Sequence, residues 1–471
     1  MNIASVTIGL RSRLTVHHGR EIITLASPIV LTMLSQTLMW TVDTIFLGHY
    51  SSLALGAAGL GGILLWTAYS AFNNLSRITG TFISQAHGRG DDHAVGDYFW
   101  QGMILATTTG LALTLIAWNA RPLLNWTGIS PEVLDASAVY MQWRGLSAVA
   151  TQWGFALMGY FQGRRQVTIP MWAGIISNVV NALLDWWLIF GFAGIAVGGQ
   201  MWLAVPEMGL RGAAIATSGG VVVNALILLV AAMGSGEARR RYRIHVPRSL
   251  SWSQLTKIVR VGIPSSVENF VDMSTFALFS TFVGRVGAVA LAANQIQVQL
   301  LSFSFMPMWG LTTAGSVLVG NWMGAGRPEA AARYGRQVYK LAVLYALGLG
   351  AGLFLLRDHV FRVFTPDPAV LAYGASLAIL AAVFQFGDGL RMIGGGLLTG
   401  AGDTRPVMLL TILVMWGLFL PAAWWIIVHK GGDVTTAWAV ASVCYLIQAA
   451  VLWWRFRSNR WQQVRIFDTD G

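Results

Sequence analysis

Twelve long apolar segments run through this chain of 471 residues, and they limit its fold more than any other feature. Each reaches the roughly 20 apolar residues that cross a ~30 Å hydrocarbon core. We place them at 21–48, 58–84, 98–120, 138–160, 167–191, 212–234, 257–284, 292–321, 338–357, 373–398, 406–429 and 435–456. Only helices and closed barrels satisfy their backbone groups in lipid, and barrel strands are shorter and alternate in polarity. The sequence therefore predicts an all-α membrane protein with twelve transmembrane helices.

Composition excludes a water-soluble protein. Charged residues make up 11% of the chain, against about 25% in a typical soluble domain. Lys and Arg outnumber Asp and Glu by 31 to 20, but this excess lies in loops between apolar segments, so we expect no nucleic-acid partner. The sequence contains no nucleophile–base constellation and no nucleotide-binding motif, so we expect neither an enzyme nor a cofactor beyond a coupling ion. The single cysteine, Cys444, lies in an apolar segment and is expected to be buried.

The basic residues also predict the orientation. Alternate loops differ roughly fourfold in Lys and Arg, which by the positive-inside rule places both termini in the cytoplasm. Three arginines, Arg77, Arg144 and Arg391, fall inside spans instead. The richest loop, 239–243, is interpreted as a topogenic linker, and binding of anionic lipid headgroups is the alternative.

The two halves of the chain repeat at a constant shift of 236 residues. Glycine and proline, which fix backbone geometry, keep this register. The matched pairs include Pro28/Pro264, Gly48/Gly284, Gly88/Gly324, Gly90/Gly326, Gly159/Gly395 and Pro170/Pro406. We therefore predict an N-lobe at 1–236, a basic cytoplasmic linker at 237–256 and a C-lobe at 257–471 with a short basic tail. Six spans per lobe imply a pseudo-two-fold axis along the membrane normal and a cavity between the lobes, as in an alternating-access carrier.

The most informative residues of the first half are polar side chains inside predicted spans. A carboxylate at mid-span costs about 2.5–3.5 kcal/mol on insertion scales, so such groups usually face a cavity. Asp43 and Asp185 lie at matched depth, roughly 8–9 Å below the outer boundary at 1.5 Å per residue. Polar residues that share their helix faces or could join them complete the candidate site, namely Gln36, Asn178, Asn181 and Thr217.

This set of side chains has three interpretations. Its oxygens could form a cage for a hard cation, with Na⁺ held by Asp43, Asn181 and Asp185. Alternatively, two carboxylates held close together cannot both stay ionised, and one would carry a proton. The third interpretation is a purely structural network of hydrogen bonds between helices. We favour ion coupling because such networks rarely contain two acids.

The second half carries a different set of acids. Glu268 and Asp272 share one face of their span, and Glu268 and Asp388 lie near mid-membrane. We predict that these three acids form a C-lobe site for a cation or a substrate. Arg391 follows Asp388 by three residues and could neutralise it as a buried pair, which makes Asp388 a weaker coupling candidate than the N-lobe acids.

Several motifs resemble the multidrug and toxic compound extrusion (MATE) family over nearly the whole chain. They are Leu25-Ala26-Ser27-Pro28 with Val42-Asp43-Thr44 and Gly48, Ser84-Gln85-Ala86 with Gly88 and Gly90, the stretches 178–191 and 209–217, and Gly400-Ala401-Gly402-Asp403-Thr404. The resemblance implies efflux of organic cations and other amphipathic compounds, driven by inward flow of protons or sodium ions. The N-lobe set falls where the DinF-like branch keeps its cation site, while Glu268 and Asp388 match the acids of the NorM-like branch. The chain thus resembles the DinF-like branch with some NorM-like features.

We therefore expect a secondary active antiporter that exports small cationic or amphipathic molecules in exchange for H⁺ or Na⁺. The expected location is the bacterial inner membrane, in contact with lipid and as a monomer. A lipid-linked oligosaccharide flippase is the first alternative, but it predicts extra spans or a cavity rich in Arg and Lys. A passive channel is the second, and the two-lobed repeat argues against it.

Overall fold

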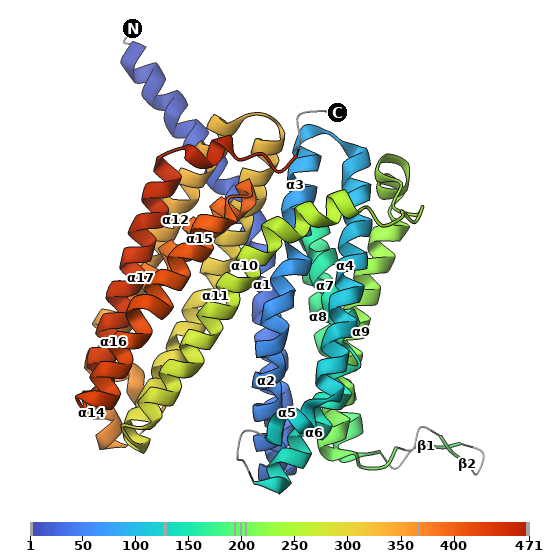
Figure 1. Ribbon diagram of the computed structural model, residues 1–471, viewed down its shortest axis with the longest axis vertical. Helices are drawn as coiled ribbons and strands as arrows, with labels where there is room; N and C mark the ends of the chain where they lie inside the picture. Colours follow the sequence, from blue (N-terminus) through green and yellow to red (C-terminus); the bar gives the residue numbers. More distant parts are fainter. Residues whose placement is uncertain are drawn as a thin grey trace. The chain divides into compact units, whose positions relative to one another are not determined.

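The structure, a computed structural model, describes residues 3–125, 130–192, 195–197, 200–202, 205–365 and 367–467 (Figure 1). Helices dominate the described part of the chain. In the first half they are α1 (Ile3–Tyr50), α2 (Ser52–Arg77), α3 (Thr79–Arg89), α4 (Asp92–Trp118), α5 (Ala120–Leu124), α6 (Pro131–Gly145), α7 (Ala148–Gly163), α8 (Thr168–Phe190), α9 (Gly209–Gly234) and the π-helix η2 (Ala238–Tyr242). In the second half they are α10 (Trp252–Gly284), α11 (Ala288–Gly324), α12 (Pro328–Leu355), α13 (Arg357–Val360), η3 (Phe361–Val363), α14 (Pro368–Ala401), α15 (Thr404–Thr411), η4 (Ile412–Phe419), α16 (Leu420–Trp424), η5 (Trp425–His429), α17 (Val434–Arg457) and η6 (Arg460–Gln463).

The prediction of an all-α membrane protein is confirmed. Ten helical segments of the described chain are long and apolar enough to cross a membrane. The two remaining predicted spans are also helical. One is the pair α6–α7, whose members have 15 and 16 residues, and the other is α10, which carries Glu268 and Asp272 in its interior.

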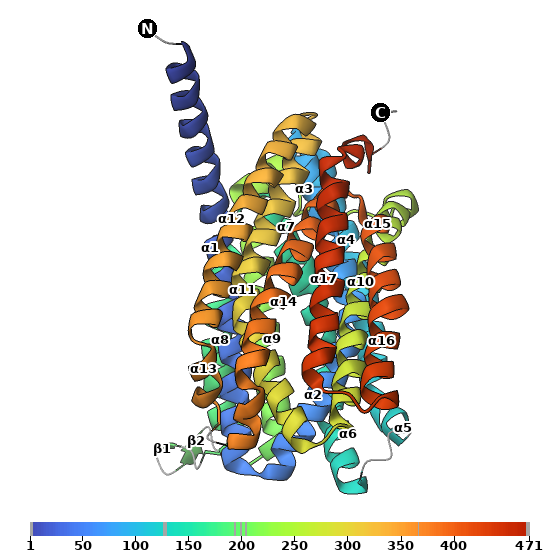
Figure 2. The ribbon, with the colours of Figure 1, turned by 90° about the vertical axis from the view of Figure 1, so that its left-hand side faces the viewer.

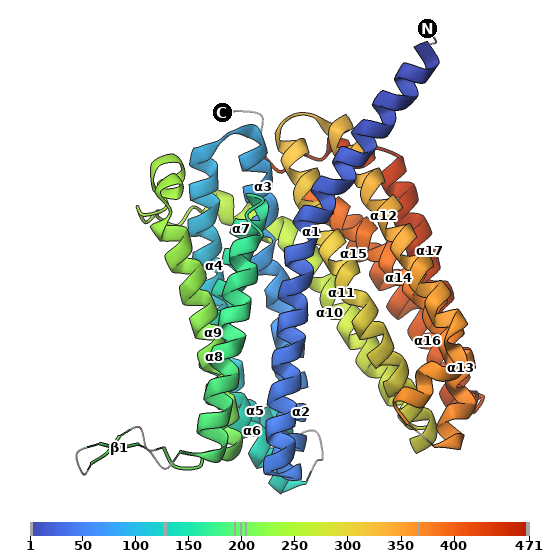
Figure 3. The same cartoon turned by 180° about the vertical axis from the view of Figure 1, so that it is seen from behind.

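Some predicted spans are interrupted. The second predicted span is divided at Ile78 into α2 and α3, and the fourth is divided between Gly145 and Ala148. The eleventh alternates between α-helix and π-helix from Thr404 to His429. The predicted loop after 191 also contains an antiparallel hairpin of β1 (Ile195–Val197) and β2 (Gln200–Trp202), which extends beyond the ends of α8 and α9 (Figure 3).

The first of two compact units comprises Leu31–Ile83 and Asp91–Val259, and we call it the first unit. In it, α8 packs along α9, α4 along α7, and α2 against α6. One apolar cluster of this unit is centred on Leu65, Tyr69 and Leu113. A second contains Leu47, Ile189 and Ala213, each of which lies one helical turn from a predicted site residue. The cores of this unit therefore bring α1, α8 and α9 together near the predicted acids.

The second unit comprises Met1–Val30, Ser84–Gly90 and Arg260–Gly471. Its centre is formed by α11, α14 and α17, and Figure 2 shows α14 and α17 side by side. This division differs from the predicted boundaries at 236 and 257, because two early stretches pack with the second half. A Cβ atom on Gly310 would lie 2.4 Å from the Val30 side chain, and Ser84 donates a hydrogen bond to the Val317 carbonyl oxygen at 2.9 Å.

Candidate functional site

Three helices of the first unit meet at a buried acidic pair. Asp43 comes from α1 and Asp185 from α8, and their carboxyl groups lie within interaction range of each other and of the Asn181 amide. The hydroxyl of Thr217 on α9 donates to Asp43 Oδ2 at 3.1 Å. Asp185 and Asn181 are fully buried. The structure thus brings together four of the six residues that the sequence predicts for this site.

Close backbone contacts let the helices reach each other here. A Cβ atom on Gly212 would lie 2.4 Å from the Leu188 carbonyl oxygen, and one on Gly220 would lie 2.9 Å from the Asn181 Cβ. These glycines flank Thr217 on α9 and allow α9 to approach α8 at the depth of the acids. Any larger residue would hold the two helices apart and separate Thr217 from Asp43.

The other two predicted members of the site lie elsewhere. Asn178 donates a short hydrogen bond to Ser35 on α1, so it joins the same two helices away from the carboxyl pair. Gln36 is exposed, and the described part of the chain provides no hydrogen bond from it to the acids. Ser35 and Asp43, eight residues apart on α1, both lie beside α8, the first at Asn178 and the second at Asn181 and Asp185.

Several atoms of this cluster are buried and lack a hydrogen-bond partner among the described residues. They are Asp43 Oδ1, both carboxyl oxygens of Asp185 and both amide atoms of Asn181. A buried polar atom without a partner is destabilising by about 1–3 kcal/mol, and more when it is charged. Carboxylate and amide oxygens are ligands that hard cations prefer, and a proton on either acid would also supply a donor. The donor set therefore suits an exchangeable cation or a proton.

Arg144 on α6 is a member of this electrostatic environment that sequence reasoning missed. It lies within electrostatic range of Asp43, Asp185 and the buried Tyr140. Its position inside a predicted span was the available signal, because an intramembrane arginine is expected to have an acidic partner. With Arg144, the cluster holds two negative charges against one positive charge when both acids are ionised.

A second acidic cluster lies inside the other unit and is organised around Arg391. The guanidinium of Arg391 lies 2.8 Å from Asp272 Oδ2 and 2.9 Å from Asp388 Oδ1. Its Nη1 is 4.0 Å from Glu268 Oε1. Asp388 and Arg391 are both buried. The structure therefore brings all three predicted C-lobe acids together, and Arg391 pairs with Asp272 as well as with the expected Asp388.

Two features of α14 and α17 complete this cluster. The Tyr445 ring lies 5.1 Å from the Arg391 guanidinium, in cation–π geometry, and nothing in the sequence pattern marked this tyrosine. Gly387, where a Cβ atom would lie 3.0 Å from the Leu446 backbone nitrogen, allows α17 to come this close to α14. The neighbouring Cys444 is buried, as expected. Asp272 Oδ1 remains buried without a hydrogen-bond partner in the described chain.

The two clusters differ in how their charge is balanced. In the second, one arginine binds two carboxylates directly, while in the first Arg144 acts on the acids without a hydrogen bond to either among the described residues. No group of three or more His, Cys, Asp or Glu side chains in the described ranges is arranged to hold a metal ion. The sodium site predicted at Asp43, Asn181 and Asp185 has only two acidic members and stays a prediction.

Comparison with known proteins identifies a shared family. The family model described as MatE matches residues 28–187 and 264–425. The probable multidrug resistance protein NorM of Thermotoga maritima is 30% identical over 451 residues, covering 94% of this chain and 93% of that protein. The multidrug resistance protein PmpM of Pseudomonas aeruginosa is 29% identical over 421 residues, covering 88% of this chain and 85% of that protein.

Solved structures show the same fold. A crystal structure of MATE in the straight conformation matches with a TM-score of 0.83 at 20% sequence identity, over 95% of this chain and 97% of that one. A crystal structure of MATE in the bent conformation matches with a TM-score of 0.81 at 19% identity, over 94% and 95% of the two chains. The all-helical fold predicted from the sequence is therefore shared with solved membrane transporters.

Proposed function

The chain belongs to the MatE family, and we propose that it is a secondary antiporter that exports small amphipathic or cationic compounds in exchange for protons or sodium ions. The multidrug resistance names of its relatives support the substrate class. The acidic pair Asp43–Asp185 supports the coupling role. We expect no enzymatic activity from this arrangement.

A buried acidic pair with unsatisfied oxygens supports this proposal. Asp43 Oδ1 and both carboxyl oxygens of Asp185 lack a hydrogen-bond partner among the described residues, so a bound proton or cation would satisfy them. In a low-dielectric interior an uncompensated carboxylate is strongly destabilising, which favours binding of one proton or one monovalent cation. Such a site can be loaded from one side of the membrane and unloaded to the other.

Ion binding and substrate binding are then coupled by thermodynamic linkage. If the loaded and unloaded clusters favour different conformations of the transporter, ion binding shifts the balance between them, and substrate binding must shift ion affinity by the same factor. The ion gradient would thus drive export without covalent chemistry. We place the protein in the bacterial inner membrane, in contact with lipid, as a monomer with both termini in the cytoplasm, in keeping with the distribution of Lys and Arg.

The test is export of a fluorescent organic cation from vesicles that contain the purified protein. Collapse of the proton gradient and omission of sodium are compared in separate arms, which identifies the coupling ion. We expect Asp43→Asn and Asp185→Asn to reduce gradient-driven export to the level of protein-free vesicles. Asp135→Asn is the matched control, because Asp135 is an exposed acid paired with Arg121. Gradient-driven export at the wild-type rate in both site variants would contradict the coupling role.

A further inference from the structure

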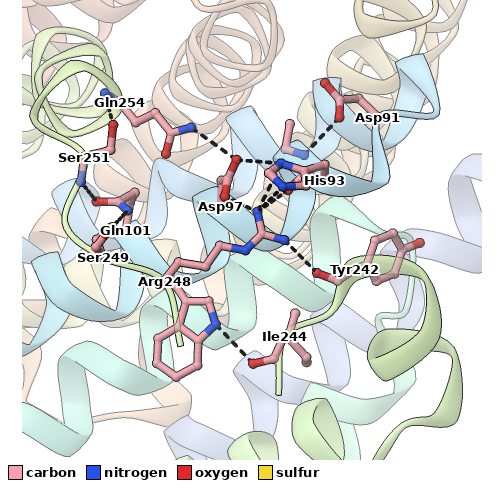
Figure 4. A network of polar contacts seen from close by, with 12 residues as sticks. Asp91, His93, Asp97, Gln101, Tyr242, Ile244, Arg248, Ser249, Ser251 and Gln254 are labelled. Atoms are coloured by element: carbon pink, nitrogen blue, oxygen red, sulfur yellow. Dashed lines mark hydrogen bonds and ion pairs between the residues drawn. The ribbon is translucent and has the colours of Figure 1, made fainter. Parts of the chain in front are cut away.

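The segment between α9 and α10 is fastened to the beginning of α4. We call residues 237–252 the linker strap. Arg248 occupies the middle of the contact, where it forms an ion pair with Asp97 and donates hydrogen bonds to the carbonyl oxygens of His93 at 2.9 Å and Tyr242 at 3.3 Å (Figure 4). The strap is therefore a fixed element of the first unit and not a loose connection.

Further contacts fix the depth of the strap. The Gln101 side chain donates to the Ser249 carbonyl oxygen at 3.0 Å and accepts from the Ser251 backbone N–H at 3.1 Å (Figure 4). Gln101 lies nine residues beyond the first residue of α4, or about 14 Å along the axis at 1.5 Å per residue. Because Asp92–Trp118 is a candidate membrane span, this part of the strap lies beside the first turns of a membrane helix. Gln101 therefore holds the strap from a position inside this candidate span.

Arg239 donates to the Met233 carbonyl oxygen at 2.6 Å, and five other arginines of this region fall into two groups. Arg164, Arg241 and Arg248 form ion pairs with Glu237, Asp92 and Asp97, respectively. Arg240 and Arg243 are exposed, and their side chains have no ionic or hydrogen-bonded partner in the described ranges. Arg243 also adopts a left-handed backbone conformation, with φ of 50°, which few residues other than glycine adopt. The first group fastens the strap, and the second leaves two positive charges available to a partner.

Apolar side chains accompany these two free charges. Val246, Leu250 and Trp252 are 49%, 41% and 72% exposed, whereas Ile244 between them and the arginines is fully buried. An exposed tryptophan in the same segment as basic residues is typical of segments that lie in the membrane interface. Arginine side chains near the surface are attracted to anionic headgroups, and each contributes separately to binding.

We propose that the linker strap is a binding site for anionic phospholipid. Arg240 and Arg243 bind the phosphate groups, while Val246, Leu250 and Trp252 enter the upper part of the acyl region. The charge and apolar character of this surface fit a lipid better than a soluble anion, since a free phosphate would make no use of the exposed apolar side chains. The strap shares no residue with either acidic cluster, so lipid binding does not depend on the coupling role proposed above.

Quenching of tryptophan fluorescence by brominated lipid tests this proposal. The protein is placed in lipid nanodiscs that contain the same fraction of either brominated phosphatidylglycerol or brominated phosphatidylcholine. The difference between wild type and Trp252→Phe isolates the Trp252 signal from that of the other tryptophans. We expect this signal to be quenched more by the anionic lipid, and high salt to remove the difference.

Two matched double variants separate a specific site from a general charge effect. Arg240→Gln with Arg243→Gln should weaken the preference for phosphatidylglycerol at Trp252 by roughly tenfold or more, since two cationic contacts are lost. Arg285→Gln with Arg362→Gln removes the same charge from two other exposed arginines and should leave the preference unchanged. Equal quenching by both lipids in the wild type, or an equal loss in both double variants, would overturn the proposal. Because all four arginines are exposed, melting temperatures near that of the wild type confirm that the comparison concerns folded protein.

Discussion

Gly88, at the end of α3, lies so close to Asn321 on α11 that a Cβ atom on Gly88 would be 1.9 Å from the Asn321 carbonyl oxygen. The reciprocal contact also exists, because a Cβ atom on Gly324 would lie 1.9 Å from the carbonyl oxygen of Gln85. Gln85 and Asn321 are equivalent positions of the 236-residue repeat, and so are Gly88 and Gly324. The same contact is thus made twice with exchanged roles, which explains why the repeat keeps glycine at both positions.

Alanine at Gly88 is expected to destabilise the protein. The new methyl group would overlap backbone atoms, which cannot move as a flexible side chain could, and overpacking of this kind is destabilising by about 1–3 kcal/mol. The measurement is thermal unfolding in detergent. Gly348→Ala is the control, because a Cβ atom there would have no neighbour within 4 Å. Equal melting temperatures for Gly88→Ala and Gly348→Ala would show that the contact is not as close as described.

The helices of this fold were predictable from sequence, but their interruptions were not. Long apolar segments predict spans because lipid imposes a minimum helix length. The break at Ile78 lies two residues before a tertiary contact, where a Cβ atom on Gly80 of α3 would lie 2.9 Å from Gly159 on α7. Such a contact involves residues almost eighty positions apart, so no local pattern could reveal it.

Removal of the Arg391 guanidinium should destabilise the second unit strongly. Arg391→Gln would leave Asp272 and Asp388 buried without their cation, and loss of one partner of a buried ion pair is typically destabilising by about 3–5 kcal/mol. The free energy of unfolding in detergent measures this effect. Asp272→Asn combined with Arg391→Gln should recover part of the loss, because one uncompensated charge is then removed. An unchanged stability for Arg391→Gln alone would contradict the geometry of this cluster.

The candidate sites show which residues a sequence can and cannot identify. Asp43, Asp185 and Asp388 could be chosen as candidates because a charge inside an apolar span is itself unusual. Gln36 shares a helix face with Asp43 in sequence but is exposed in the structure, and its membership of the site stays a prediction. Tyr445 could not be found, since an aromatic residue in a membrane helix carries no signal of its own.

Neutralisation of Arg144 should tighten ion binding at the Asp43–Asp185 pair. Arg144 opposes the binding of another positive charge, so Arg144→Gln should lower the concentration of the coupling ion that gives half-maximal export. A tenfold decrease in this concentration corresponds to about 1.4 kcal/mol of binding free energy. The repulsion between two positive charges 4 Å apart is larger, ~4 kcal/mol at an effective dielectric constant of 20. Titration of export against external sodium and proton concentrations provides the measurement. Arg121→Gln, which removes an exposed arginine, should leave the half-maximal concentration unchanged. An increase in that concentration for Arg144→Gln would contradict the electrostatic argument.

Loss of Arg164 should release the linker strap from the first unit. Arg164 is buried beneath η2, where it donates to the Tyr160 hydroxyl at 2.6 Å, pairs with Glu237 at 3.0 Å and lies 4.5 Å from the Tyr242 ring. Each charged hydrogen bond contributes about 1.5–3 kcal/mol, so Arg164→Ala should raise the population of the opened strap by roughly tenfold or more. Limited digestion with trypsin measures this population, because the strap contains several arginines and cleavage requires local opening. Arg164→Lys should give an intermediate rate, since lysine keeps the charge but not the planar guanidinium that stacks on Tyr242. Cleavage at the wild-type rate in Arg164→Ala would show that Arg248 and Gln101 hold the strap without it.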